Sequence, residues 1–199
     1  MQLGLLLKAA RALRAGRFGD AVAYKAAALG APAFPDVQQQ LDRLHPLFPR
    51  IDPGTLRTHG PGTFGAEYLR FIQANRLSPI AVTAPVASEL AARHALAVRY
   101  PVLHDAFHVL LGFDVSIAGE LGVWSFVAAQ RYSPSYERAA ALARHLYPLL
   151  APAQLRALRA AALRGKALGH EVPCLIAQPL EAYWHQSLPE VRQRLHIRL

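Results

Sequence analysis

The sequence predicts an all-α fold in a single domain spanning residues 1–199. Alanine, leucine and arginine dominate the chain, and β-branched residues are sparse outside short patches, which favours helices over strands. Proline and glycine recur at intervals that suit the ends of helices. With 199 residues, 53% of them hydrophobic, the chain can bury a substantial core. We therefore expect one multi-helix bundle.

Each predicted helix is a run of helix-forming residues bounded by proline, glycine or a polar turn. The first runs from Leu5 to Leu29, because no polar linker interrupts it. The segment from Pro46 to Gly65 is dense in proline and glycine and predicts a long irregular loop. The other helices are predicted at Asp36 to Leu44, Phe64 to Asn75, Ala87 to Arg99, Val102 to Leu111, Val115 to Gln130, Tyr136 to Leu149, Pro152 to Gly165, Leu175 to His185 and Pro189 to Leu195. Breaks between helices are predicted at Ala31-Pro32, Pro46 to Pro49, Asp52-Pro53-Gly54, Gly60 to Gly62, Ser78-Pro79 and Ser133-Pro134.

The chain carries a net positive charge. Its 22 Lys and Arg residues against 13 Asp and Glu give a formal net charge of +9, which favours anionic partners such as phospholipid surfaces, phosphorylated ligands or nucleic acid. Nearly all of the cations are arginines, so a compositional bias explains the excess equally well. Basic and aromatic residues do not alternate as they do in known nucleic-acid-binding modules, so we expect no nucleic-acid partner.

The sequence predicts peripheral rather than transmembrane contact with a membrane. No stretch reaches the ~18 to 20 apolar residues of a spanning helix. The first predicted helix places arginines beside apolar residues, a combination typical of helices at a membrane interface and also of ordinary solvated helices. These residues are Arg11, Arg14 and Arg17 with Leu6, Leu7, Leu13 and Phe18. Cys174 is the only cysteine, so no internal disulfide can form and the chain is compatible with a reducing compartment.

The segment from Leu103 to His108 is the first candidate for a site with chemistry. In a helix, His104, His108 and Asp105 point at roughly 0°, 40° and 100° around the axis, from ~100° per residue. Two histidines at positions i and i+4 on one helical face are a recurrent way of presenting two imidazoles to a metal. The aspartate between them can supply an oxygen ligand or a base.

A carboxylate on the next helix is predicted to join this site. Gly112-Phe113-Asp114 supplies a turn, so a helix that starts near Val115 can fold back against the first. Glu120 then shares an apolar stripe with Trp124, where a carboxylate is costly to bury unless it is paired or bound to a cation. We therefore predict a site for one divalent metal, and nitrogen and oxygen ligands of this kind favour zinc. Its predicted ligands are His104, Asp105, His108 and Glu120.

Other interpretations of the motif stay open from the sequence alone. The histidines could be ordinary core or surface residues, with Glu120 in an ion pair with an arginine. A zinc protease carries Glu where Asp105 stands, and the shorter side chain would reach a water molecule poorly. A phosphohydrolase of the HD type also starts from His-Asp, but it needs a separate upstream His and a downstream Asp as ligands.

The sequence resembles the coenzyme Q (ubiquinone) biosynthesis protein 4 family. His104-Asp105-x-x-His108, with eleven residues before Glu120, is similar to the HDxxH-x11-E signature of that family. The likeness extends from Phe34 to Ile197. Further similar segments are Gly62-Thr63-Phe64-Gly65 with Tyr68 and Phe71, Ser78-Pro79, Gly112, Gly119-Glu120, Arg164-Gly165-Lys166-Ala167, Tyr183-Trp184 and Leu188 to Ile197. The chain departs from the family pattern at Ile80 to Pro85, at Arg99 to Leu103 and at His185, and these departures leave the metal motif whole.

The resemblance implies a role in ubiquinone biosynthesis on a polyprenylated benzoate or benzoquinone intermediate, whose tail would lie in an apolar groove between helices. It implies a metal-dependent step, the removal of the C1 carboxyl group by an oxidative route or otherwise, with Asp105 or a metal-bound water exchanging protons. The expected partners are the quinone precursor, a membrane surface, other ubiquinone biosynthesis proteins and a second copy in a homodimer. The expected location is the cytoplasmic side of a bacterial inner membrane or the matrix side of the mitochondrial inner membrane.

A rival hypothesis makes the protein a non-catalytic, lipid-binding scaffold that organises the other biosynthesis proteins. In that case the metal only joins two helices, so a first shell of four protein ligands is expected, whereas an open coordination position would favour an enzyme. Aromatic residues at helical spacing are candidates for the lipid-binding face, although such spacing is more often ordinary core. They are Phe64, Tyr68, Phe71 and Trp124.

Overall fold

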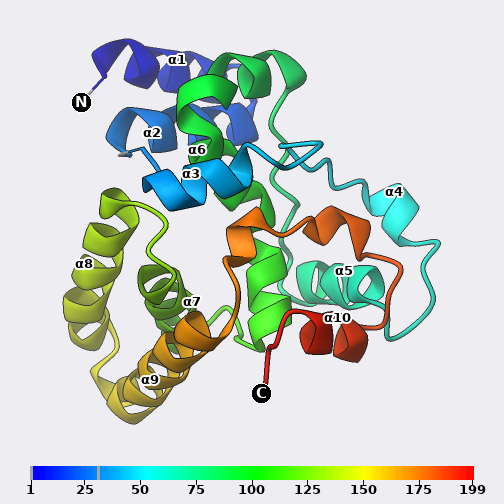
Figure 1. Cartoon of the computed structure of the whole chain (residues 1–199). Helices are drawn as coiled ribbons and strands as arrows, with labels where there is room; N and C mark the ends of the chain where they lie inside the picture. Colours follow the sequence, from blue (N-terminus) through cyan, green and yellow to red (C-terminus); the bar gives the residue numbers. More distant parts are fainter. Residues whose placement is uncertain (1, 31) are drawn as a thin grey trace.

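The computed structural model describes residues 2–30 and 32–199 and confirms the predicted all-α fold. Within these residues ten α-helices and three 3-10 turns are assigned and no strand. Ala31, part of a predicted break, lies outside the described residues. α6, Ala84–Leu111, runs through the middle of the molecule, with α1 and α2 at one end (Figure 1). Among the described helices, none combines the length and apolar composition that crossing a membrane would take.

The N-terminal residues form a helical hairpin, so the prediction of one helix from Leu5 to Leu29 is wrong. α1 (Leu3–Arg14) and α2 (Phe18–Leu29) are separated by a turn at Gly16, whose φ of +72° is readily adopted by glycine. A small core rich in alanine lies between this hairpin and the first half of α6. The buried Asp20 carboxylate ties α2 to that half, because it accepts hydrogen bonds from the backbone N–H and the hydroxyl of Thr83.

α6 is continuous through Pro101, so the predicted break near that residue is wrong. Proline removes only one hydrogen bond of the helix, and the buried side chains on both sides, Tyr100 and Val102, keep this stretch packed in the core. The helix instead departs from helical geometry at His94, with φ −137° and ψ 30°. The second half of α6 is the centre of the main core, where Leu103 and Phe107 are fully buried.

Short helices precede α6. α3 (Pro35–Leu41) ends three residues before the predicted end. The predicted irregular loop contains one helical turn, α4 (Pro53–Leu56), which is capped by the Asp52 carboxylate accepting from the N–H groups of Gly54 and Thr55. α5 (Phe64–Ala74) follows the N-cap Thr63 and begins at its predicted start, Phe64.

α7 (Ile117–Ala129), α8 (Pro134–Leu150) and α9 (Leu155–Glu171) pack on one side of α6 (Figure 1). α9 starts after a 3-10 turn, η1 (Pro152–Gln154), and runs six residues past its predicted end. α7 and α9 approach closely, because both present glycines at their contact.

The C-terminal segment is less helical than predicted. The predicted helix from Leu175 to His185 is replaced by two 3-10 turns, η2 (Leu175–Ala177) and η3 (Leu180–Ala182). Pro179 between them has no N–H and disfavours helical geometry at the residue before it. The buried Arg99 guanidinium donates to the backbone carbonyls of Ile176 and Gln178, so α6 holds this segment in place. α10 (Leu188–Arg194) follows as predicted.

Candidate metal centre

The turn between α6 and α7 sets the position of the site. Gly112 ends α6 with φ +65°, and its N–H donates to the carbonyl of His108. The Asp114 carboxylate accepts from the Ser116 backbone N–H at 3.1 Å, and Ser116 in turn caps α7 by accepting from the Gly119 N–H. α7 therefore begins at Ile117, two residues after the predicted start, and Glu120 lies in its first turn.

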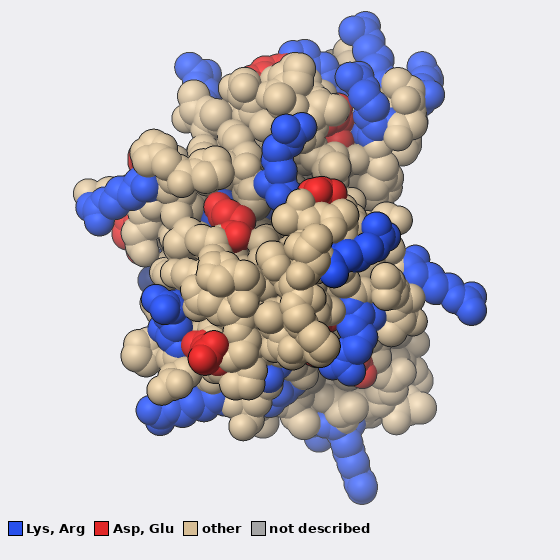
Figure 2. All heavy atoms as spheres, turned by 90° about the vertical axis from the view of Figure 1, so that its right-hand side faces the viewer, with Lys and Arg blue, Asp and Glu red and all other residues tan. Residues whose placement is uncertain are grey.

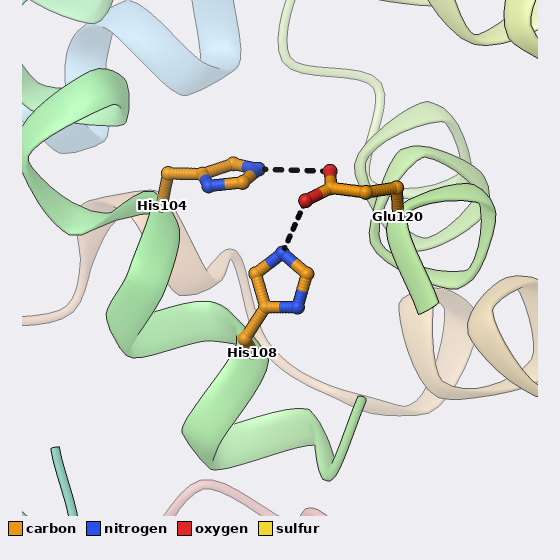
Figure 3. A group of neighbouring side chains, drawn as sticks. All are labelled: His104, His108 and Glu120. Carbon is orange, nitrogen blue, oxygen red and sulfur yellow. Dashed lines mark ion pairs between the residues drawn. The ribbon is translucent and has the colours of Figure 1, made fainter. Parts of the chain in front are cut away.

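Three of the four predicted ligands meet between α6 and α7 (Figure 3). The Nε2 atom of His104 lies 3.6 Å from Glu120 Oε2, and the Nε2 atom of His108 lies 3.3 Å from Glu120 Oε1. One ligand atom from each of the three side chains falls within 4.8 Å of the others. The His108 side chain is 1% exposed and the His104 and Glu120 side chains are 24% and 30% exposed, so the site is open on the side of His104 and Glu120.

His108 has an unpaired nitrogen that faces the cluster. Its Nδ1 lies 3.3 Å from the Phe113 carbonyl oxygen, an acceptor only, which favours the tautomer with the proton on Nδ1. Its buried Nε2 has no hydrogen-bond partner in the described part of the chain. Nε2 lies 3.3 Å from Glu120 Oε1. When it carries a proton it can donate toward that carboxylate, and when it is deprotonated it offers the lone pair that a metal ligand needs. A buried polar atom without a partner is costly, and a cation between the three side chains would remove that cost.

Asp105 lies outside this cluster of ligand atoms. Its Oδ1 atom is 3.4 Å from Nδ1 of His104, on the ring nitrogen opposite the one that faces Glu120. Metal-binding histidines commonly donate their second N–H to a carboxylate in this way, which fixes the ring orientation and the tautomer. The structure therefore brings His104, His108 and Glu120 together and places Asp105 behind His104.

The charges in the cluster are strongly coupled. Burial alone would lower the pKa of His104, but hydrogen bonds and charge interactions with Asp105 and Glu120 outweigh it and raise this pKa to about 9. Burial alone would raise the pKa of Glu120, but His104 and His108 lower it to about 2. At neutral pH a proton on His104 thus balances the carboxylates, and a divalent cation would take its place.

The donor set fits a divalent metal. Two imidazole nitrogens and one carboxylate are typical of catalytic zinc sites, which keep a fourth position open, and also of non-haem iron(II) sites. Since the described residues contribute three ligand atoms rather than four, the arrangement does not match the closed shell expected of a purely structural zinc site.

The four aromatic residues predicted to bind lipid do not share one surface. Phe64 and Tyr68 are fully buried and pack against Trp184 in the core. Phe71 stacks on the His108 ring, with centroids 5.6 Å apart. Trp124 alone of the four lines an apolar cavity.

An apolar cavity of about 490 Å³ lies between α2, α6 and α8, with Trp124 of α7 at its wall. Tyr100 and Tyr136 line it together with Trp124, whereas the exposed side chains of Lys25 and Arg93 lie at its rim. Tyr100 precedes His104 by one helical turn, and their rings meet edge to face with centroids 5.6 Å apart. The cavity therefore adjoins the cluster. Tyr100 was not among the predicted site residues, although its position four residues before His104 places it on the same face of the helix.

Lys and Arg side chains are spread over the surface rather than gathered in one strip on the face shown in Figure 2, where acidic side chains lie among them. Several basic side chains project at the end of the molecule where Figure 1 shows α1 and α2. On α1 and at the start of α2, the large apolar side chains of Leu3, Leu7, Leu13 and Phe18 are exposed.

Comparisons with known proteins agree with the motif. A family model described as "Coenzyme Q (ubiquinone) biosynthesis protein Coq4" matches residues 47–199. The mitochondrial ubiquinone biosynthesis protein COQ4 homologs of Bos taurus and Homo sapiens are 35% and 34% identical over 151 residues, which is 74% of this chain and 55% of each relative. The chain thus spans about half the length of the curated relatives that it matches.

A crystal structure from Nostoc punctiforme PCC 73102, of a protein provisionally named a ubiquinone biosynthesis protein, matches the fold with a TM-score of 0.62. The match covers 99% of this chain and 95% of that chain at 24% identity, so it supports the architecture alone. The family model covers most of the residues and both curated relatives exceed 30% identity. On this evidence the chain belongs to the coenzyme Q (ubiquinone) biosynthesis protein Coq4 family.

Proposed function

We propose that the protein acts in ubiquinone biosynthesis as an enzyme that uses a divalent metal on a prenylated benzoate or benzoquinone intermediate. The observation that supports this most is the three-ligand cluster of His104, His108 and Glu120, with a buried Nε2 that lacks a hydrogen bond among the described residues. Tyr100 contacts His104 of this cluster and also lines an apolar cavity. A polar reacting end and an apolar tail are the two parts of such a substrate. The cluster and the cavity suit one part each.

His104, His108 and Glu120 would hold the metal, and the bound cation would stabilise negative charge on a ring carboxylate or phenolate during loss of the C1 carboxyl group. His108 is held for this by the Phe113 carbonyl, and His104 by Asp105. Asp105 is 18% exposed and touches the ligand His104 directly, so it can also accept or return a proton at the edge of the site.

The cavity would take the part of the prenyl tail closest to the ring. Its volume of about 490 Å³ lies within the range of small-molecule sites and leaves no room for a long tail. The remainder would leave past Leu29, which is exposed at the rim. A tail that leaves the protein needs a membrane to cover it, so we place the protein at the surface of the inner membrane, bacterial or mitochondrial.

The rival proposal, a lipid-binding scaffold for other biosynthesis proteins, uses the same cavity. It requires the metal only to join α6 and α7, a task that four protein ligands would perform better than three. The open side of the cluster, where His104 and Glu120 are partly exposed, favours the enzyme.

The test is complementation of a strain that lacks its native coenzyme Q biosynthesis protein 4. We expect His108→Ala to lose the metal and the ability to restore ubiquinone, with a prenylated precursor that keeps its C1 carboxyl group accumulating instead. His145→Ala is the matched control, because His145 is exposed on α8 and belongs to no ligand cluster among the described residues. Full restoration of ubiquinone by a folded, metal-free His108→Ala protein would rule out the metal-dependent step.

A further inference from the structure

The hydroxyl group of Tyr100 is buried and unpaired. The residue is 5% exposed, and its hydroxyl has no hydrogen-bond partner among the described residues. Tyr132, in the same aromatic cluster with its ring centroid 6.5 Å away, shows the ordinary arrangement. Its hydroxyl donates to the Gln130 side chain and accepts from the Ile176 N–H. Buried hydroxyl groups are nearly always satisfied, so an unpaired one beside a cavity points to a missing partner.

Tyr100 stands where the apolar cavity meets the ligand cluster. Its ring is part of the cavity wall and also contacts His104, which lies one turn further along α6. Trp124 has the corresponding position on α7, because it also lines the cavity and lies one helical turn from a ligand, Glu120. The two rings, with centroids 6.3 Å apart, flank the boundary between the cavity and the cluster. A ligand that extends from the cavity to the ligand cluster must pass the rings of Tyr100 and Trp124.

Most of the remaining walls near Tyr100 supply apolar contact, although the polar side chains of Gln38, His94 and Ser135 also line the cavity. Leu96, Ala97 and Pro101 line the cavity on the same helix, and Tyr136 packs edge to face on the Tyr100 ring at 4.8 Å. A pure hydrocarbon would satisfy these contacts and leave the Tyr100 hydroxyl unpaired. A ligand with a ring oxygen close to Tyr100 would make the apolar contacts and also pair with the Tyr100 hydroxyl.

We propose that Tyr100 is a positioning and specificity-determining residue, whose O–H donates a hydrogen bond to a ring oxygen of a prenylated aromatic or quinone ligand. The inference deepens the proposed function and rests on it, because it assumes that the prenyl tail occupies the cavity. It assigns Tyr100 the task of setting how far the ring enters, so that the ring stops against His104. It also makes the site select oxygenated rings over hydrocarbon tails.

Titration calorimetry with two probes tests this assignment. The probes are geranyl-1,4-benzoquinone and geranylbenzene, which share the tail and differ in the ring oxygens. The full chain is compared with Tyr100→Phe, which keeps the ring and removes only the hydroxyl, and with Tyr132→Phe as the matched control. Metal content and melting temperature are measured for each variant.

We expect Tyr100→Phe to weaken binding of the quinone by about tenfold, the loss of one hydrogen bond, and to leave geranylbenzene affinity unchanged. Its melting temperature should stay equal or rise, because the hydroxyl has no partner to lose. Tyr132→Phe should show the opposite pattern, with a lower melting temperature and an unchanged ratio of the two affinities.

The outcomes separate this inference from the proposed function. If the unmodified chain binds the quinone and Tyr100→Phe binds it equally well, the assignment of Tyr100 is wrong while the proposed function stands. If the unmodified chain binds neither probe, both are wrong. A fall in the affinities of Tyr100→Phe for both probes by the same factor would assign the hydroxyl a structural role and overturn the inference.

Discussion

Gly165 of α9 lies against Gly122 of α7 so closely that a Cβ atom on Gly165 would come within 2.1 Å of the Gly122 carbonyl oxygen. The obstacle is backbone, which cannot rotate away as a side chain can. Glu120 is two residues before Gly122 on the same helix. The position of this ligand relative to the histidines of α6 therefore depends on α9, a helix that contributes no ligand itself.

Gly165→Ala is expected to push α7 and α9 apart, lowering stability by about 1–3 kcal/mol as in other overpacked sites, and weakening metal binding. The measurements are melting temperature and zinc affinity. Gly4→Ala on α1 is the control, because its Cβ would meet nothing within 4 Å and alanine is the better helix former by up to about 1 kcal/mol. Unchanged zinc affinity in a destabilised Gly165→Ala protein would contradict the link between α9 and Glu120.

Metal affinity should rise with pH up to about pH 9. The pKa of His104 is raised to about 9 in the folded protein, so below that pH the metal must displace a proton from the imidazole. Each pH unit between 7 and 9 should then strengthen binding by up to about tenfold, with roughly one proton released per metal bound. Calorimetry in buffers of different ionisation enthalpy counts that proton. A flat affinity across this range would contradict the raised pKa.

The same pair of groups makes the stability of the metal-free protein depend on pH. Because the pKa of His104 is raised in the folded state, its protonated side chain contributes fully to stability below pH 6.5. This contribution is lost as the pH rises through about 9. Because the pKa of Glu120 is lowered in the folded state, its carboxylate contributes fully to the stability of the fold above pH 4.5. This contribution is lost as the pH falls through about 2. The metal-free protein should therefore lose melting temperature between pH 7 and 9, whereas zinc-loaded protein should lose less.

Asp105→Asn separates catalysis from scaffolding. The asparagine oxygen can still accept from Nδ1 of His104, so folding and most of the metal should remain, while the charge and the proton-accepting function are lost. Ubiquinone production in the complemented strain should collapse if the protein is an enzyme. Glu120→Ala is the control that both hypotheses expect to weaken metal binding. A folded, metal-loaded and fully complementing Asp105→Asn protein would favour the scaffold.

Anionic vesicles should bind the protein more tightly than neutral ones. Arg11 and Arg14 lie on α1 among exposed apolar side chains, and each basic residue near such a surface contributes about 1 kcal/mol. Replacing both with Gln should weaken vesicle binding by roughly tenfold or more at low salt. The double change Arg50→Gln and Arg57→Gln, at two exposed positions near α4, is the control. Equal loss in both variants would assign the effect to net charge alone.

The sequence predicted those parts of the fold and the site that depend on local pattern. The i and i+4 spacing places His104 and His108 on one helical face whatever the rest of the chain does, and the turn at Gly112 returns Glu120 to them. Asp105 was predicted as a ligand because it lies between the two histidines on the same part of the helix surface. One step along a helix, however, rotates the direction of a short side chain by about 100°. That rotation takes its carboxylate to the far side of the His104 ring.

Errors arose where distant contacts decide the outcome. Periodicity cannot reveal that α1 and α2 fold on each other at Gly16, or that α6 continues through Pro101 because its neighbours are buried. The cavity is formed by side chains from α2, α6 and α8, which lie far apart in the sequence. The burial of Phe64 and Tyr68 likewise depends on a distant contact, since Trp184 reaches them from the C-terminal segment.

The core beneath α1 and α2 consists largely of alanine side chains, which bury little apolar area each. The two helices should therefore detach as a cooperative unit at a lower free energy than global unfolding. Because α2 forms one wall of the cavity, such a partial opening would expose its interior while the ligand cluster, built on the main core, stays intact. Detachment of the hairpin would therefore widen the way into the cavity without any change in the positions of His104, His108 and Glu120.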